Sequence, residues 1–201
     1  MFLFYESFAS GGMRNAYKAT AEDGEVFVIK MYKPEKWEEV KSIYGMDLQS
    51  HNRKQVQMHS VANELARKYQ KAISDHREHG DHFRYHTISY SSVAAESVTV
   101  ERFIKGNFTK YVNNDGKTRD GDSELSKKAE ALCHFSYVAT NEKLLLVDIQ
   151  GFGYTLCDPE IATPSIMDDS EFQFVRVIWG RQRSTTLKKD IYAISIADLS
   201  G

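Results

Sequence analysis

The spacing of apolar residues changes several times along this chain of 201 residues, and each change predicts an element. Val26–Tyr32, VFVIKMY, has apolar residues on both of its alternating faces and predicts a strand with little water on either side. From Trp37 to Ile73 the pattern becomes helical and predicts one amphipathic helix that ends before Gly80. Ser97–Ile104, SVTVERFI, alternates and is rich in β-branched residues, which predicts a second strand.

The segment Leu144–Asp158, LLLVDIQGFGYTLCD, combines a buried strand with acidic residues. Four apolar residues run without alternation into Asp148, which suits a strand that is buried on both faces and ends at an edge or cleft. Gln150 and Asp158 follow, so carboxylate and amide oxygens gather near one strand end, as they do where Mg²⁺ is held against a phosphate. A core strand capped by a polar turn is the alternative interpretation.

A glycine turn and a lone lysine mark the N-terminal part. Gly11 and Gly12 allow a turn that approaches a ligand closely, with Arg14 just beyond it, although an ordinary hairpin has the same signature. Lys30 lies inside the first predicted strand and must reach an edge or pair with an anion, because an unpaired buried ammonium is costly. Glu64 on the predicted helix is one possible partner, although it lies off the apolar stripe.

Two further places could carry chemistry. The second strand ends before Gly106, where backbone groups of Glu101 and Ile104 could hold an adenine ring as a neighbouring strand would. Asp75–His86, DHREHGDHFRYH, contains four histidines that could bind Zn²⁺, but their spacing fits no single ligand template, and the prediction is a solvated loop. His134, on a predicted helix over Ser126–Tyr137, is more often a core residue than a ligand in such a place.

Composition narrows the classes of protein that fit. A hydrophobic content of 41% with three prolines indicates a packed chain, long enough for one core or two small lobes. The net charge of −2 gives no general attraction to nucleic acid or membrane, and no apolar run is long enough to span a bilayer. The two cysteines form no disulfide framework. We therefore expect a cytoplasmic protein without a nucleic-acid or membrane partner.

Five segments together resemble the alpha-kinase family of atypical protein kinases. They follow in order from about Phe8 to about Ile161: FASGGMRNAY, VFVIKMY, VERFIKGNFTKY, HFSY and LLLVDIQGFGYTLCDPEI. The resemblance implies an α+β, two-lobed protein-kinase-like fold with mostly antiparallel sheets and a helix in the N-lobe. It implies an N-lobe over residues 1–104, a C-lobe with the catalytic aspartate over 105–170 and a divergent segment over 171–201.

The resemblance also assigns roles to individual residues. Asp148 is similar to the catalytic aspartate that orients or deprotonates the attacking hydroxyl, and Lys30 to the lysine that contacts the ATP phosphates. Gln150 and Asp158 are similar to the Mg²⁺ ligands, and His134 to the first ligand of a structural zinc. The residues implied to contact ATP are Gly11, Gly12, Arg14, Lys30, Glu101 and Ile104.

The resemblance is incomplete after Ile161. Alpha-kinases continue with an Asn- and Gly-rich segment and a His-x-Cys-x-x-x-Cys cluster that completes the zinc site. No histidine follows His134 here, and Cys157 alone cannot replace the cluster. Since structural zinc contributes folding free energy, its loss would leave a chain that is destabilised or repacked.

Three functions are consistent with these residues. The first is a serine/threonine kinase that transfers the γ-phosphate of Mg-ATP to a protein substrate. The second is a non-catalytic module that binds a nucleotide or a partner, which the incomplete C-terminal part favours. The third is a magnesium-dependent phosphohydrolase that uses Asp148 and Asp158, but it leaves the glycine turn and Lys30 unexplained.

Overall fold

A computed structural model describes residues 3–74, 80–114, 116–119 and 123–163 and divides the chain into two compact units. The first unit contains Met1–Ser60 and His86–Gly106, and the second contains Val61–Tyr85 and Asn107–Gly201. Val61–Tyr85 thus belongs with the second unit, whereas the division expected after residue 104 put it with the first. The segment 171–201 lies outside the described residues.

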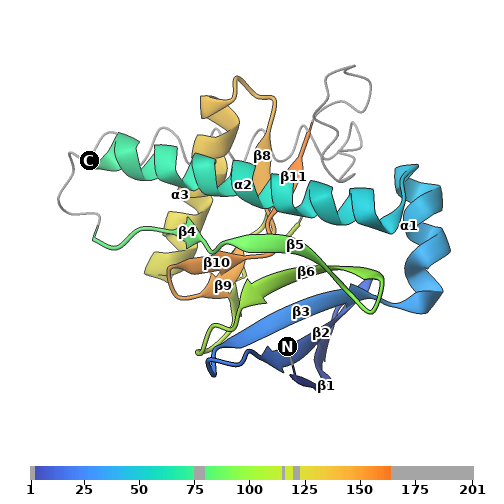
Figure 1. Cartoon of the computed structure of the whole chain (residues 1–201). Helices are drawn as coiled ribbons and strands as arrows, with labels where there is room; N and C mark the ends of the chain where they lie inside the picture. The colour runs from blue at the N-terminus through green and yellow to red at the C-terminus, as the bar shows by residue number, and fades with distance from the viewer. Residues whose placement is uncertain (1–2, 75–79, 115, 120–122, 164–201) are drawn as a thin grey trace. The chain divides into compact units, whose positions relative to one another are not determined.

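The first unit is built on an antiparallel sheet whose strand order is β1-β2-β3-β6-β5 (Figure 1). Its core side is formed by Ala19, Ile29 and Val98, which face one another from three adjacent strands and are fully buried. The strand predicted at Val26–Tyr32 is confirmed, and the one predicted at Ser97–Ile104 is shifted toward the N-terminus. The strands are β1 Leu3–Ser10, β2 Arg14–Thr20, β3 Val26–Tyr32, β5 Ile88–Val93 and β6 Glu96–Arg102.

The single helix predicted from Trp37 to Ile73 is wrong, because the chain forms two helices there. After a short 3-10 turn over Pro34–Lys36, α1 covers Trp37–Tyr44 and α2 covers Leu48–Ile73 (Figure 1). Gly45 ends α1 with a left-handed backbone (φ 62°) and donates its N–H to Lys41 O. Asp47 then accepts a hydrogen bond from the Ser50 N–H at the start of α2. Among the described residues, no helix has an apolar stretch that could cross a membrane.

The second unit contains a four-stranded sheet, a two-stranded sheet and the helix α3. The four-stranded order is β4-β10-β9-β7, with β4 parallel to β10 and the other pairs antiparallel, and β8 pairs antiparallel with β11. The helix predicted at Ser126–Tyr137 is confirmed and begins at a Ser123 cap. The elements are β4 Arg84–Tyr85, β7 Thr109–Lys110, α3 Glu124–Ala139, β8 Leu145–Val147, β9 Gln150–Phe152, β10 Thr155–Cys157 and β11 Glu160–Ala162.

The predicted buried strand before Asp148 is confirmed as β8, whose three residues are all buried. It begins one residue later than the four apolar residues Leu144–Val147, and the chain turns at Asp148 as expected, where the backbone is left-handed (φ 53°). The described elements together confirm the predicted class, an α+β fold with mostly antiparallel sheets.

Gly151 in β9 has no space for a side chain. A Cβ atom there would lie 2.2 Å from Thr155 O and 2.8 Å from Leu156 Cα, both of which are backbone atoms that cannot simply rotate away. We predict that Gly151→Ala lowers the free energy of unfolding by about 3 kcal/mol, measured by urea unfolding. Gly12→Ala is the control, because nothing lies within 4 Å of its Cβ position. Equal losses in the two variants would contradict the prediction.

Candidate functional site

Lys30 forms a buried ion pair with Glu101 across the sheet of the first unit. In the register of β3 and β6, Thr99 lies opposite Lys30 and Glu101 lies opposite Val28, so the two charged residues share a face as diagonal neighbours. Lys30 Nζ lies 2.9 Å from Glu101 Oε1, and the two side chains are 11% and 10% exposed. The anion that the buried lysine requires is therefore Glu101.

Two predictions for this region are wrong, namely Glu64 as a partner of Lys30 and a solvated position for His86. Glu64 is not the partner of Lys30, because it pairs with Arg67 and Lys68 on its own helix. His86 is not part of a solvated loop, because its side chain is 11% exposed and its Nε2 lies 3.1 Å from Glu101 Oε2. Its ring also packs edge-on against His59. Of the other loop histidines, His76 and His79 lie outside the described residues, and His82 is half-buried.

Arg14 lies on the same face of the sheet as Lys30, two residues along β2 from the position opposite it. Its Nη1 donates to Thr99 Oγ1 at 3.1 Å, and its guanidinium carbon lies 5.9 Å from the centre of the Tyr32 ring. The glycine turn directly precedes it, where the Gly11 N–H donates to Arg14 O and closes the hairpin between β1 and β2. The predicted glycine turn and both predicted cations are thus brought together in the first unit.

His51 connects α2 to this face of the sheet through a hydrogen bond between its Nδ1 and the Tyr32 hydroxyl. Burial, and to a lesser extent the charge of Arg14, lower the pKa of His51 from 6.5 to about 4. The unfolded chain therefore takes up a proton near pH 6.5, where the folded protein does not.

We predict that stability is fully present above about pH 6.5 and falls as the pH drops toward 4, by up to about 3 kcal/mol from this residue. Urea unfolding between pH 7 and pH 4 measures the loss. His51→Gln keeps an acceptor for Tyr32 but does not titrate, so it should lose less stability over the same range. An identical pH dependence in both proteins would assign the effect to other groups.

Two residues are expected to contact adenine, and one lies inside a strand whereas the other lies beyond its end. Glu101 lies within β6, between β3 and β5, so its neighbours on both sides are strands. Ile104 lies beyond the last residue of β6 and is half-buried. Backbone contacts of these residues with adenine stay a prediction.

In the second unit, Asp148 is held between Lys110 and Gln150. Lys110 Nζ lies 2.5 Å from Asp148 Oδ1, and the Gln150 side-chain amide donates to Asp148 Oδ2 at 3.1 Å. Lys110 and Gln150 lie directly opposite each other on β7 and β9, so the pairing of these strands builds the site. The same Gln150 nitrogen lies 3.4 Å from Asp158 O. All three predicted residues of this segment are therefore brought together.

A third carboxylate, Glu160, adjoins this group and was not predicted. Burial first, and then the charges of Asp148 and Asp158, raise the pKa of Glu160, while Lys110 opposes the shift. Its Oε2 is buried without a hydrogen-bond partner. Neighbouring carboxylates whose negative charges repel one another are the donor set that a hard divalent cation relieves, so these oxygens fit Mg²⁺.

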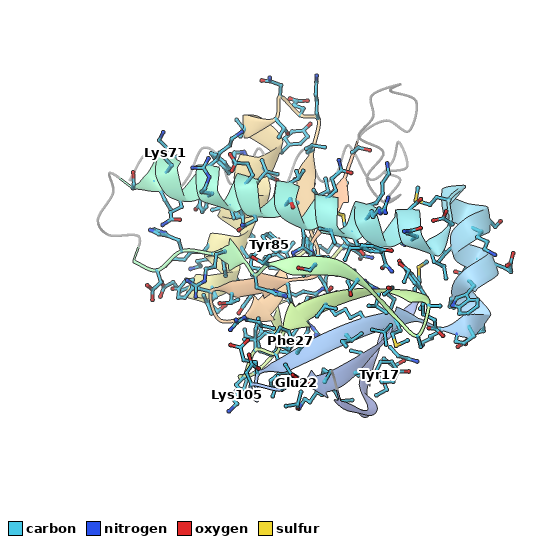
Figure 2. The ribbon with its side chains drawn as sticks, viewed as in Figure 1. Tyr17, Glu22, Phe27, Lys71, Tyr85 and Lys105 are labelled. Atoms are coloured by element: carbon cyan, nitrogen blue, oxygen red, sulfur yellow. The ribbon has the colours of Figure 1, made fainter. Side chains whose placement is uncertain are left out.

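Tyr85, which Figure 2 labels, is buried on β4 of the same unit. Burial, with smaller effects from Cys157, Cys133 and Asp148, raises the pKa of its hydroxyl far above the ordinary value. The hydroxyl therefore stays neutral.

His134 is half-buried on α3, and burial lowers its pKa. In the described part of the chain it belongs to no group of three metal-binding side chains. The neighbouring Cys133 thiol is buried and free, with its pKa raised to about 12 by burial. A zinc role for His134 stays a prediction.

Comparison with known proteins identifies the family. A model of the alpha-kinase family matches residues 9–173. The chain belongs to the alpha-kinase family. It is similar to the Homo sapiens transient receptor potential cation channel subfamily M member 6, with 27% identity over 165 residues, 78% of this chain and 8% of that protein. Homo sapiens eukaryotic elongation factor 2 kinase is 36% identical over 69 residues, 34% of this chain and 9% of that protein.

Solved structures confirm the two-lobed kinase-like fold. An alpha kinase from Entamoeba histolytica matches with a TM-score of 0.63 at 20% identity, over 92% of this chain and 72% of that one. The alpha-kinase domain of myosin-II heavy chain kinase A in complex with AMP-PNP matches with a TM-score of 0.60 at 19% identity, over 81% and 74%. This alpha-kinase chain spans less than a tenth of the length of the two full-length relatives above.

Proposed function

We propose that the chain is a protein kinase that transfers the γ-phosphate of Mg-ATP to a serine or threonine hydroxyl of a protein. The observation that carries the proposal is Asp148, whose carboxylate is fixed by Lys110 and Gln150 beside two further acids in a member of the alpha-kinase family. Phosphoryl transfer depends mainly on positioning and on electrostatic stabilisation, which such a group supplies.

On the nucleotide side, the cations of the first unit are suited to phosphate. Lys30 and Arg14 share one face of the sheet, and the exposed glycines of the turn offer backbone that a phosphate can approach. Glu101 holds the Lys30 ammonium in place, so that less conformational freedom is lost when the phosphates bind. An alpha-kinase domain of similar fold was solved in complex with AMP-PNP, which supports nucleotide binding by this chain.

On the acceptor side, Asp148 orients the substrate hydroxyl and accepts its proton. Lys110 occupies Oδ1, and the Gln150 amide occupies one lone pair of Oδ2, so the remaining capacity of Oδ2 is available to the hydroxyl. Gln150, Asp158 and Glu160 would hold Mg²⁺, which neutralises charge on the phosphates when bound.

A non-catalytic nucleotide-binding module is the second candidate. It needs only the cations Lys30 and Arg14, which share one face of the sheet of the first unit, and no transfer at Asp148. A cytoplasmic location is also proposed, supported by two buried cysteines that are not joined in a disulfide.

Thermal unfolding with and without Mg-ATP tests the nucleotide site, and a ligand at a hundred times its dissociation constant should add about 2.7 kcal/mol of stability. Transfer of labelled phosphate to a basic protein then distinguishes the two candidates. Stabilisation with transfer supports the kinase, and stabilisation without transfer supports the module. The absence of any shift at millimolar Mg-ATP would contradict both.

A further inference from the structure

Two aromatic rings form an exposed pair on the four-stranded sheet of the second unit. Phe108, directly before β7, and Phe152, at the end of β9, have ring centres 5.6 Å apart in an edge-to-face arrangement. Phe108 is 54% exposed, and Phe152 is half-buried beneath it. Exposing a large ring to water forgoes the free energy of its burial, so the pair offers binding energy to an apolar side chain.

The strand register places this pair beside the proposed catalytic group. Thr109 lies opposite Gly151, and Lys110 lies opposite Gln150. Because alternate residues of a strand point to the same face, Phe108 and Phe152 share a face with Lys110 and Gln150 and lie two cross-strand pairs further along. Both Lys110 and Gln150 contact the Asp148 carboxylate.

The spacing fits an extended peptide. Two residues of strand cover about 7 Å, which is also the spacing of side chains on one face of an extended peptide. In the described part of the chain β7 is the last strand of its sheet, so an extended segment could lie along its edge. When the serine or threonine hydroxyl of the peptide lies at Asp148, the side chain about two to four residues away along the peptide lies over the aromatic pair.

We propose that Phe108 and Phe152 bind an apolar side chain of the protein substrate about two to four residues from the phosphorylated serine or threonine. This assignment rests on the proposed kinase function and adds a determinant of substrate choice to it. The contact acts through substrate binding, and the residues that hold ATP are separate from it.

The test uses synthetic peptides with one serine and a single leucine that is moved through the four positions on each side of it, against a peptide with glycine throughout. Wild-type protein should prefer leucine at two to four residues by about tenfold in kcat/KM, mainly through KM, which is the effect of burying one apolar side chain. Phe108→Ser should reduce this preference to less than about twofold and leave KM for ATP unchanged.

Val138→Ser is the matched control, because Val138 is 57% exposed on α3 of the same unit and is also apolar. It should retain the leucine preference. A preference that survives Phe108→Ser, or a leucine effect only next to the serine, would overturn the assignment. If Phe108→Ser lowers KM equally for all peptides, the assignment is also overturned. Such a result would mean that another part of the chain covers the rings in the wild-type protein.

Fluorescence anisotropy with labelled peptides separates this assignment from the kinase function. If no peptide is phosphorylated but the leucine peptide binds more tightly than the glycine peptide, and Phe108→Ser removes the difference, the kinase function fails and the aromatic contact stands. If transfer occurs without any leucine dependence of binding or rate, the aromatic contact fails and the kinase function stands.

Discussion

Asp148→Asn is expected to lower kcat for phosphate transfer by about a thousandfold, within the range for loss of a general base. Asparagine has the same shape, tolerates the left-handed backbone at this position and can still accept the hydrogen bond from Gln150. It carries no charge and cannot take the proton of the attacking hydroxyl. KM for ATP should change little, because the substitution does not alter the first unit. The urea midpoint should fall, because the ion pair with Lys110 is lost, so kcat is compared at a temperature where both proteins are folded.

Asp81→Asn is the matched control for this variant. Asp81 lies on an exposed part of the second unit, and its backbone oxygen accepts a hydrogen bond from Lys128. Replacing its carboxylate by an amide is therefore the same chemical change outside the site. It should keep full activity. If transfer survives in Asp148→Asn, the base is a different carboxylate, and Glu160 is then the next to replace because it adjoins Asp148.

The sequence predicted what local patterns determine. Apolar residues on both faces of Val26–Tyr32 determine a largely buried strand, and burial requires an anion for Lys30. The identity of that anion depends on the register between β3 and β6, which are far apart in the chain, and no local pattern specifies it. The same reason explains His86, whose charged surroundings in the sequence indicate solvent, whereas pairing with Glu101 buries it.

The second half of the site shows the same limit. Asp148, Gln150 and Asp158 were predicted because oxygen donors follow one apolar run. Lys110 was missed because it lies on a two-residue strand whose pairing with β9 alone brings it to Asp148. Glu160 was missed because its importance comes from burial and from neighbouring charge, which the D-P-E-I sequence does not indicate. The break at Gly45 was detectable, since glycine commonly ends helices.

The buried pair of Lys30 and Glu101 should give unequal losses when either member is replaced. Glu101→Gln removes the anion from a lysine that is 11% exposed and should lower the free energy of unfolding by about 3–5 kcal/mol. Lys30→Met should cost less, because Glu101 keeps His86 at 3.1 Å and a protonated imidazole can replace the ammonium. Urea unfolding of both variants measures the difference, and equal losses would show that His86 does not compensate.

The double variant Lys30→Met with Glu101→Met separates stability from function. It removes both charges together, so its loss should be smaller than the sum of the single losses by about 2 kcal/mol. The exposed pair of Lys41 and Glu38 on α1 is the control cycle and should show no measurable coupling. If the buried pair exists to present a cation to phosphate, the double variant will fold well and yet lose its stabilisation by Mg-ATP. A double variant that still gains full stability from Mg-ATP would show that Lys30 has no part in nucleotide binding.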